Sequence, residues 1–494
     1  MAPIESAAMN EPPALLRFGL APGGLSALRR HDLLSAKRGR ILKSTLALLD
    51  TTDRRFAAAG WLCLALDDTE GKRIVTLPVS GLPLAPAPAL DEVGDLEKLA
   101  EGTQSGHIYS LRQDGHAIML QGYKVQLKSG KRSAVYEALT LQAPAEAGAA
   151  VDAMAGDLVR ELPLRWTGAA PLIQAAAALD LVEPQSLRAA GLDFDPPDDA
   201  SAAVVLAAIG RHCLAQFDAN LLPVLRDRNA EGVHQMRVAL RRLRSAIGVF
   251  SAMLDDSALN PLLDDLRWLG APLGRKRDLD VFLTETLTPL RSLPDAPKRL
   301  QHLATILEDR RVSAQEALDA ALNAPRLAAM RLGLNRFLSA VEAGDAAVLS
   351  DTALASAPAA DFASDILHRR RRKVKALGSR HAELDVPELH DLRIRAKKLR
   401  YAAEFFRPLF KHRKGSRRFI AALAHLQDCL GMLNDADVGT RLVRDLLPSP
   451  DQDPAAAAIA AWFSGRQQVQ LAQLGEAWDS FAALRPFWKD RRSS

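Results

Sequence analysis

Two stretches of sequence decide the fold of this chain. They read Val233-His-Gln-Met-Arg-Val-Ala-Leu-Arg-Arg-Leu-Arg244 and Leu389-His-Asp-Leu-Arg-Ile-Arg-Ala-Lys-Lys-Leu-Arg400. They align at a spacing of 156 residues, with a histidine at the head of each and an arginine three residues later. Segments that recur in a fixed register are typical of a duplicated architecture. The sequence therefore predicts a helical part built from two copies of one bundle.

Each stretch has two faces when it is drawn as an α-helix. At about 100° per residue the basic positions fall within an arc of about 80°, and apolar positions occupy the adjacent arc. The basic row rises about 15 Å along the helix axis. Its members are His234, Arg237, Arg241 and Arg244 in the first copy and His390, Arg393, Lys397 and Arg400 in the second. We predict that one face packs and that its neighbour presents a row of cations.

A row of basic residues on a helix is most often a solvated face, usually balanced by carboxylates four residues away. No carboxylate occurs in Val233–Phe250. Stacked like charges repel, and a bound anion would relieve that repulsion. The planar fork of arginine suits phosphate oxygens, and a nearby anion favours charged histidine. We therefore predict that both rows bind an anion; the alternatives are a solvated face and, for each histidine, a buried structural role.

Further basic residues either extend this surface or form solvated helix ends, and the sequence leaves both interpretations open. They occur in His368-Arg-Arg-Arg-Arg-Lys373 with nearby Lys375, and in Lys411-His-Arg-Lys414 with nearby Arg417 and Arg418. Arg242 and Lys398 are on the same helices as the rows but lie off them. The less certain candidates are Arg242, Lys398, His368, Arg369, Arg372, Lys375, Arg417 and Arg418. Four acidic residues, Asp278, Asp280, Asp435 and Asp437, are expected to cap helices or to orient arginines. No metal-ligand spacing accompanies the histidines, so we predict no metal and no cofactor.

The length of 494 residues fits two or three domains. We predict a first domain over 1–170, a linker over 171–200 that includes the acidic, proline-bearing stretch Asp193–Asp199, and a helical domain over 201–494. The helical halves are expected over about 201–340 and 361–490. Residues 1–200 carry 20 Lys+Arg and 25 Asp+Glu, whereas residues 201–494 carry 44 and 34. The basic excess belongs to the helical part and points to an anionic partner for it.

The first domain is predicted to be α+β, with strands in one antiparallel sheet or barrel. Short apolar runs alternate there with Asp-Gly, Glu-Gly and Ser-Gly turn signals. The expected strands are Lys43–Asp50, Gly60–Leu66, Arg73–Val79, Ala117–Lys128 and Ala134–Gln142, and the expected helices are Leu25–Leu34 and Glu146–Arg160.

The compartment is expected to be the cytoplasm. No run of 18 apolar residues occurs, so no membrane span and no membrane partner is predicted. The first residues lack a basic region followed by an apolar run, which would mark a secretory signal. The three cysteines are far apart in the chain, which fits a reducing environment.

The helical part resembles the CHAD family, whose motif is His-x-x-Arg-x-x-x-Arg/Lys-Arg/Lys-Leu-Arg followed by Leu-Gly-x-x-Arg/Asn-Asp-x-Asp. The second element reads Leu273-Gly-Arg-Lys-Arg-Asp-Leu-Asp280 and Leu430-Gly-Met-Leu-Asn-Asp-Ala-Asp437. The resemblance covers about 200–490. It implies two helical bundles with a basic cavity that binds inorganic polyphosphate, and association with polyphosphate granules.

The N-terminal part is similar to the CYTH family, a triphosphate-tunnel β-barrel. Leu48-Leu-Asp-Thr51 and Arg160-Glu-Leu-Pro-Leu-Arg165 resemble two of its segments. The Glu-x-Glu-x-Lys strand of that family falls on Pro13, Leu15 and Arg17, and its Leu-Arg-x-Arg strand reads Cys63-Leu-Ala-Leu66. Phosphoanhydride hydrolysis of this kind needs carboxylates that hold a metal ion. We therefore expect no catalytic residues and no enzyme, only a degenerate barrel.

Three functions follow from these patterns. The leading prediction is a polyphosphate-binding protein with a basic groove formed by the two rows. A nucleic-acid-binding protein is the alternative, and the low aromatic content of 5% disfavours it because single-strand binders stack bases on aromatic rings. A metal-dependent triphosphatase is the least favoured. A protein partner for the N-terminal domain, the chain length of the polymer and the oligomeric state are not predicted.

Overall fold

The computed structural model of the protein describes residues 14–69, 71–79, 86–90, 95–188, 196–294, 298–410, 413–431, 439, 443–444 and 453–489. The chain forms two compact units. Unit 1 comprises Met1–Arg188, Ala215–Met236 and Asp319–Ser339, and unit 2 comprises Ala189–Leu214, Arg237–Leu318 and Ala340–Ser494. The units do not coincide with the boundaries predicted at 170 and 200, because two helical segments beyond residue 200 pack in unit 1. Each unit is described separately below.

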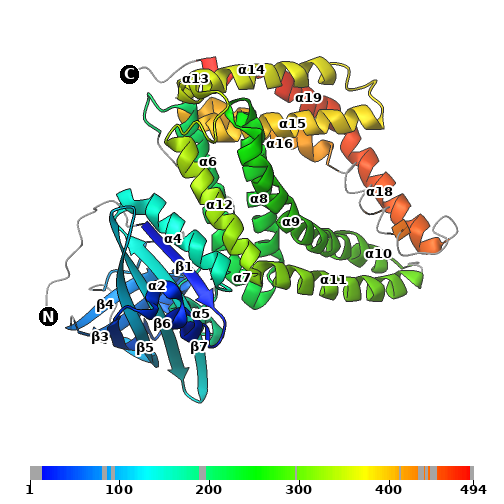
Figure 1. Ribbon diagram of the computed structural model, residues 1–494. Coiled ribbons are helices and arrows are strands. Elements are labelled where there is room, and N and C mark those ends of the chain that lie inside the picture. The colour runs from blue at the N-terminus through cyan, green and yellow to red at the C-terminus, as the bar shows by residue number, and fades with distance from the viewer. Residues whose placement is uncertain are drawn as a thin grey trace. The chain divides into compact units, whose positions relative to one another are not determined.

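Unit 1 contains an eight-stranded antiparallel sheet with the strand order β4-β3-β2-β5-β6-β7-β1-β8. Its strands are the blue and cyan arrows of Figure 1. The strands are β1 (Ala14–Leu20), β2 (Arg40–Thr51), β3 (Trp61–Asp68), β4 (Gly71–Pro78), β5 (Leu96–Gln113), β6 (His116–Ser129), β7 (Arg132–Ala143) and β8 (Arg165–Trp166). The five predicted strands correspond to β2, β3, β4, β6 and β7. Three strands, β1, β5 and the two-residue β8, are not among the predicted ones.

The predicted closed barrel is not confirmed, because β4 and β8 remain the edges of the sheet within the described residues. Strand β8 has two residues and pairs only with Phe18 and Gly19 of β1. Closure needs a strand long enough to bridge both edges. The antiparallel sheet is nevertheless compatible with the CYTH-like fold that we expected for the N-terminal part.

Five helices accompany the sheet within residues 14–188 of the described chain. They are α1 (Gly24–Arg30), α2 (Asp32–Ser35), α3 (Arg55–Ala58), α4 (Gly148–Glu161) and α5 (Pro171–Ala178). The single helix expected over Leu25–Leu34 is divided at His31, which has an extended backbone and accepts a hydrogen bond from Leu33 as an N-cap. Helix α1 lies tightly on β6, since a Cβ at Gly122 would stand 2.7 Å from the Leu28 side chain.

Helix α5 packs on one face of the sheet, although we predicted 171–200 as a linker. Its Leu172, Ile173 and three consecutive alanines are buried in one core cluster with sheet residues such as Leu48 and Leu64. The small side chains of the Ala175–Ala177 run let the helix approach the strands closely. The helical character of this alanine-rich segment was missed because it lacks a 3.6-residue alternation of polar and apolar positions.

A buried ion pair joins the sheet to helical segments of the same unit. Arg331 is 4% exposed and binds Asp218 through Nε at 3.1 Å and Nη2 at 2.6 Å. The indole Nε1 of Trp166 donates to Asp218 at 2.8 Å, and the Arg331 guanidinium lies 4.6 Å from the centre of the Trp166 ring. The pair therefore links β8 to the helices that carry Asp218 and Arg331.

The described residues from 202 onward lie mostly in helices. These helices are α6 (Ala202–Ala219), α7 (Leu221–Asp227), α8 (Ala230–Phe250), α9 (Asp256–Val281), α10 (Thr288–Arg291), α11 (Arg299–Asn323), α12 (Pro325–Glu342), α13 (Thr352–Ser356), α14 (Ala359–Gly378), α15 (Val386–Phe406), α16 (Arg413–Cys429), α18 (Pro454–Ala472) and α19 (Leu474–Ala482). Helices α8 and α15 have equal length and begin 156 residues apart. The C-terminal segment forms two helices, α18 and α19.

Aromatic side chains fasten the two copies together within unit 2. Phe250 at the end of α8 stacks on Phe362 of α14 at 4.9 Å and contacts Phe406 at the end of α15 at 5.6 Å. All three rings are buried. Helix α15 begins with a capping box between Asp385 and Glu388, which fixes where its first turn starts. The matching ends of α8 and α15 are thus held side by side.

None of the described helices is both long and apolar enough to cross a membrane.

Removing the carboxylate of Asp218 should destabilise unit 1 strongly. The Asp218→Ala variant leaves the buried Arg331 without its counterion, and we expect the free energy of unfolding to fall by about 3–5 kcal/mol. Urea denaturation followed by circular dichroism measures this change. Asp157→Ala is the matched control, because the pair of Asp157 with Arg160 is exposed and should contribute about 0–1 kcal/mol. Equal losses in the two variants would contradict the role of the buried pair.

Candidate functional site

The predicted rows of α8 and α15 meet inside unit 2. The guanidinium carbon of Arg241 lies 5.8 Å from the centre of the Tyr401 ring, and that of Arg242 lies 5.9 Å from the centre of the Phe405 ring. On α15 the guanidinium of Arg400 lies 5.1 Å from the same Tyr401 ring. One arginine of each row therefore lies against a single aromatic side chain.

The ammonium of Lys397 is close to several of these cations. Partial burial and the nearby charges of Arg393, Arg241 and Arg237 lower its pKa to about 8. Two of these arginines come from α8 and one from α15, so the rows are close enough to repel each other. Burial also lowers the pKa of Arg241, and Arg237 and Arg400 lower it further, whereas Tyr401 acts in the opposite sense.

Carboxylates neutralise only part of this cation cluster, which we define as Arg237, Arg241, Arg393, Lys397 and Arg400. Asp278 lies 3.6 Å from the Nη2 atom of Arg237. Arg400 donates to Glu404 at 2.8 Å and to the side-chain oxygen of Gln427 at 3.1 Å. Within the part of the chain that the structure describes, no ion pair is recorded for Arg241 or Lys397. Arg241 and Lys397 therefore keep positive charges that pair with no carboxylate of the described residues.

The other members of the rows differ in exposure. Arg244 and His390 are exposed, as is Lys398. His234 is half-buried one turn before Arg237 on α8 and belongs to unit 1. Arg242 is 4% exposed, which leaves its guanidinium little surface for a ligand.

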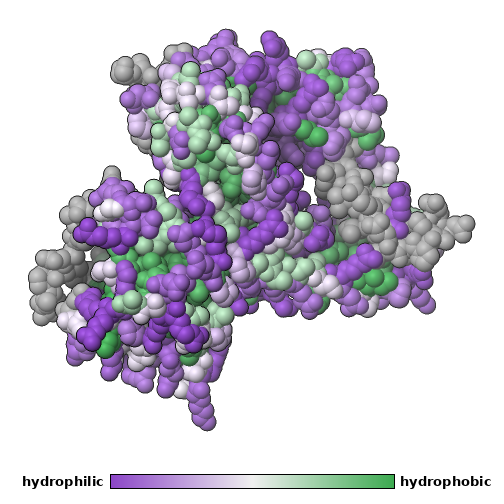
Figure 2. All heavy atoms as spheres, viewed as in Figure 1, coloured by the Kyte–Doolittle hydropathy of each residue, from purple (hydrophilic) through white to green (hydrophobic). Residues whose placement is uncertain are grey.

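Several of the basic residues on α14 have structural partners. Lys375 donates to the carbonyl oxygen of Ala482 at 3.4 Å, and the ring of His368 packs edge-on against Trp488 at 5.6 Å. Arg369 and Arg372 on α14, and Arg417 and Arg418 on α16, are exposed. Hydrophilic side chains predominate along α14 and α15 on the face in view (Figure 2). These four arginines are therefore available to an anion, whereas His368 and Lys375 also serve packing.

The acidic motif after α8 includes a buried pair that the sequence did not single out. Lys276 donates to both carboxylate oxygens of Asp280 at 2.5 and 2.6 Å, and both side chains are 5% exposed. Arg311 adds a third charge at 3.8 Å from Asp280. Asp278 contacts an arginine, as we expected, and Asp280 binds a lysine. The second copy of the motif, with Asp435 and Asp437, lies outside the described residues, as do Lys411 and His412.

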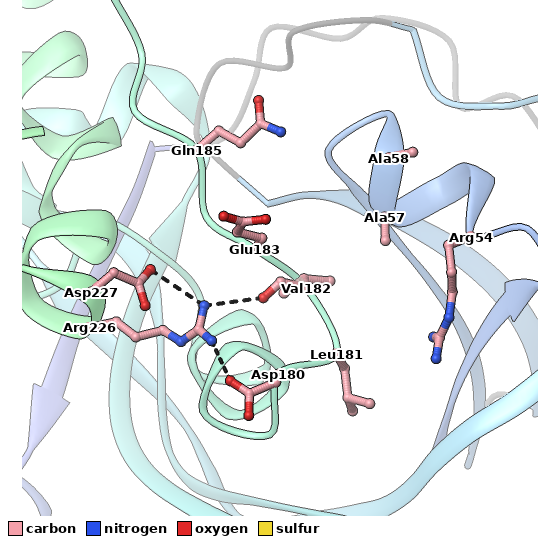
Figure 3. Close-up of a pocket in the computed structure, with 10 residues that line it drawn as sticks. All are labelled: Arg54, Ala57, Ala58, Asp180, Leu181, Val182, Glu183, Gln185, Arg226 and Asp227. Atoms are coloured by element: carbon pink, nitrogen blue, oxygen red, sulfur yellow. Dashed lines mark hydrogen bonds and ion pairs between the residues drawn. The ribbon is translucent and has the colours of Figure 1, made fainter. Parts of the chain in front are cut away.

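Unit 1 has an open cavity of about 530 Å³ beside α3 (Figure 3). Two arginines, Arg54 and Arg226, line it. Arg226 is already bound by Asp180 at 2.5 Å and by the carbonyl oxygen of Val182 at 3.4 Å, with Asp227 at 3.5 Å. Glu183 adds an exposed carboxylate to the wall. Because acidic side chains outnumber basic ones there, the cavity does not fit a polyanion.

Neither thiol nor metal chemistry is evident in the described residues. Burial raises the pKa of the Cys63 thiol to about 11 and that of Cys213 to about 12, so both are protonated and unreactive at neutral pH. No group of three or more His, Cys, Asp or Glu residues in the described chain is arranged to hold a metal ion.

Comparisons with known proteins were made for the whole chain. The CHAD domain model matches residues 208–444. The crystal structure of the CHAD domain from the plant Ricinus communis is 30% identical, covers 61% of this chain and 98% of its own, and superposes with a TM-score of 0.51. None of the curated proteins matches the chain.

Two further solved structures are more distant. PptA from Streptomyces chartreusis is 17% identical over 57% of this chain and 98% of its own, with a TM-score of 0.39. HpAC1 from Hippeastrum, an adenylyl cyclase candidate described as having a dominant triphosphatase activity, is 13% identical over 34% of this chain and 96% of its own, with a TM-score of 0.25. Neither likeness carries an argument about this chain. The match to the Ricinus domain extends over nearly its whole length, and the chain therefore belongs to the CHAD family through a domain that spans residues 208–444.

Proposed function

We propose that this protein binds inorganic polyphosphate through a basic groove lined by the rows of α8 and α15. The observation that carries the proposal is the cation cluster, in which Arg237 and Arg241 lie close enough to Lys397 to lower its pKa. Bringing like charges together in a partly buried place costs free energy in the unbound protein. A ligand with many closely spaced negative charges would recover that free energy on binding. Membership of the CHAD family supports the same ligand.

The proposal assigns contacts in two groups. The cation cluster would form the centre of the groove, with His234, Arg244 and His390 continuing the two rows. The exposed Arg369, Arg372, Lys398, Arg417 and Arg418 would extend the basic surface for a long polymer. In the cell, such binding would place the protein in the cytoplasm on polyphosphate granules.

Nucleic acid is the second candidate ligand, and the geometry disfavours it. Single-strand binders stack bases on exposed aromatic side chains. Tyr401, the aromatic residue in contact with both rows, is 2% exposed and is covered by arginines and Phe405. A base could not stack on this ring without displacing them.

We further propose that unit 1 is not a triphosphatase. The register places Leu15 and Arg17 opposite Gln142 and Thr140, on the sheet face that also carries Leu64. Leu64 occupies a position where the CYTH family has an arginine, and here it is 1% exposed in the apolar core under α5. Arg17 is a cation on this face, but the positions of the family's two carboxylates hold Pro13 and Leu15, so the strand offers no carboxylate pair to a metal ion.

Reversing one charge in each row should abolish polyphosphate binding. For the Arg237→Glu, Arg393→Glu double variant we expect the Kd to rise by about 100-fold or more, since two charge-assisted contacts become repulsive. Fluorescence anisotropy of end-labelled polyphosphate at several salt concentrations measures this change. Wild-type affinity should fall steeply with salt, because counterions leave the polymer on binding.

The matched control is Arg211→Glu, Arg267→Glu, which changes the net charge equally at exposed arginines that already pair with Glu342 and Asp264. Its affinity should stay near that of the wild type, and both double variants should keep their helical circular dichroism. Undiminished binding by the first variant would refute the site. Tighter binding of RNA than of polyphosphate, at equal charge and salt, would favour the nucleic-acid alternative.

Binding should be coupled to proton uptake above about pH 8. Lys397 of the free protein has a pKa of about 8, so its ammonium loses its proton as the pH rises through that value. A bound polyanion favours the ammonium and raises this pKa. Affinity should therefore be constant well below pH 8 and weaken by up to about tenfold per pH unit above it.

Calorimetry at pH 8.5 in buffers of different ionisation enthalpy measures the protons taken up. The Lys397→Arg variant keeps its charge over this range, so the uptake attributable to residue 397 should vanish. Titration of the polymer itself would be the same for both proteins. Equal uptake by the variant and the wild type would show that Lys397 is not part of the site.

Tripolyphosphate should not be hydrolysed. We expect no phosphate release above background with Mn²⁺ or Mg²⁺, because unit 1 lacks the carboxylate pair that would hold the metal ion. The full chain is the proper sample, since unit 1 includes Ala215–Met236 and Asp319–Ser339. Metal-dependent release at a rate proportional to protein concentration would overturn this proposal.

A further inference from the structure

Tyr401 is a buried aromatic residue in contact with both rows of cations. The guanidinium carbons of Arg241 and Arg400 lie 5.8 and 5.1 Å from the centre of its ring, within the range of cation–π attraction. These arginines come from different copies of the repeat, α8 and α15. The ring therefore connects the two rows at one point.

The ring itself has little freedom to move. It is 2% exposed and stacks on Phe405 at 6.2 Å with an angle of 16° between the planes. Phe405 in turn lies 5.9 Å from the guanidinium of Arg242, which is itself buried. The stack extends from the surface rows into the core of unit 2, and it fixes the plane of the Tyr401 ring.

The duplication does not account for this residue. At the repeat spacing of 156 residues the position of Tyr401 corresponds to Ser245. The Ser245 hydroxyl donates to the carbonyl oxygen of Arg241 at 2.8 Å and remains local to its own helix. The aromatic ring thus belongs to one copy and contacts arginines of both.

Two guanidinium groups so close to other cations would separate if nothing restrained them. Arg400 has a partial restraint in Glu404, whereas no ion pair is recorded for Arg241 among the described residues. The negative face of an aromatic ring attracts cations without neutralising them. A ring can therefore hold an arginine in place and leave its charge available to a ligand.

We propose that Tyr401 is a positioning residue, which holds Arg241 and Arg400 against one ring so that both copies of the repeat grip the same segment of the polyanion. The inference rests on the proposed function, since it assigns a role within that binding site. It implies that the contributions of the two arginines to binding depend on each other and on the ring.

The test compares the Tyr401→Leu, Tyr401→Phe and Phe406→Leu variants of the full chain, with end-labelled polyphosphate as the ligand. Tyr401→Leu should weaken binding by about tenfold, because both cation–π contacts are lost. It should also reduce the slope of log Kd against log salt by about one for each guanidinium that leaves the polymer. Tyr401→Phe keeps the ring and loses only the hydroxyl that also interacts with Arg241, so it should restore most of both quantities.

Phe406→Leu is the control for packing, since Phe406 is buried and contacts Phe250 and Phe362. Within the described part of the chain, its ring makes no cation–π contact with an arginine of the rows. It should lower stability and leave the salt slope unchanged. Equal salt slopes for Tyr401→Leu and the wild type would overturn the proposal. Wild-type protein that fails to bind polyphosphate would instead refute the proposed function itself.

A second measurement leaves Tyr401 in place, so it tests the proposal even if the Tyr401→Leu variant does not fold. Arg241→Gln, Arg400→Gln and the double variant form a thermodynamic cycle for polyphosphate binding. Two arginines that share one ring and one segment of ligand should give a double variant that loses less than the product of the single fold-changes. Independent, multiplicative losses would overturn the proposal.

Discussion

Repulsion between cations of α8 and α15 is the constraint on which the rest of unit 2 depends. The lowered pKa values of Lys397 and Arg241 show that the rows are close and partly desolvated. Apolar packing must supply the free energy that keeps them there. The buried rings of Phe250, Phe362 and Phe406 do so where the two helices end, and the Tyr401–Phe405 stack does so beside the charges. The apolar core thus holds the two rows of cations together despite their repulsion in the unbound protein.

The strongly periodic parts of the fold could be predicted from the sequence, and the parts whose role depends on tertiary packing could not. The 156-residue repeat gave α8 and α15 with matching bounds, because a 3.6-residue pattern is local information. Strand β5 and helix α5 lack such a pattern. They are buried because they pack into one core with the other strands of the sheet. The sequence predicted the two rows only as separate helix faces. That Tyr401 joins them depends on which helices become neighbours. The pairing of Lys276 with Asp280 is local, since they lie four residues apart on α9, but the burial of this pair depends on the surrounding helices.

One face of the sheet in unit 1 packs against α5. Leu48 and Leu64 on this face are buried in one core cluster with residues of the helix. The same unit takes in Ala215–Met236 and Asp319–Ser339, and helices α6, α8 and α12 each contribute residues to both units. A chain cut at the end of the sheet would separate Trp166 from the Asp218–Arg331 pair. The sheet is therefore part of the folding unit of these helices.

The carboxylates beside the cation cluster bear on which anions could bind there. Asp278 and Glu404 already occupy part of the coordination of Arg237 and Arg400, so any ligand competes with them. A monovalent anion would gain one contact and leave most of the repulsion around Lys397 in place. A polymer presents several charges at once, and its affinity includes the release of its own counterions. The balance of cations and internal carboxylates thus favours a polyvalent ligand over a simple anion. Several negative charges are needed to offset the repulsion among the cations, which is unfavourable in the unbound protein.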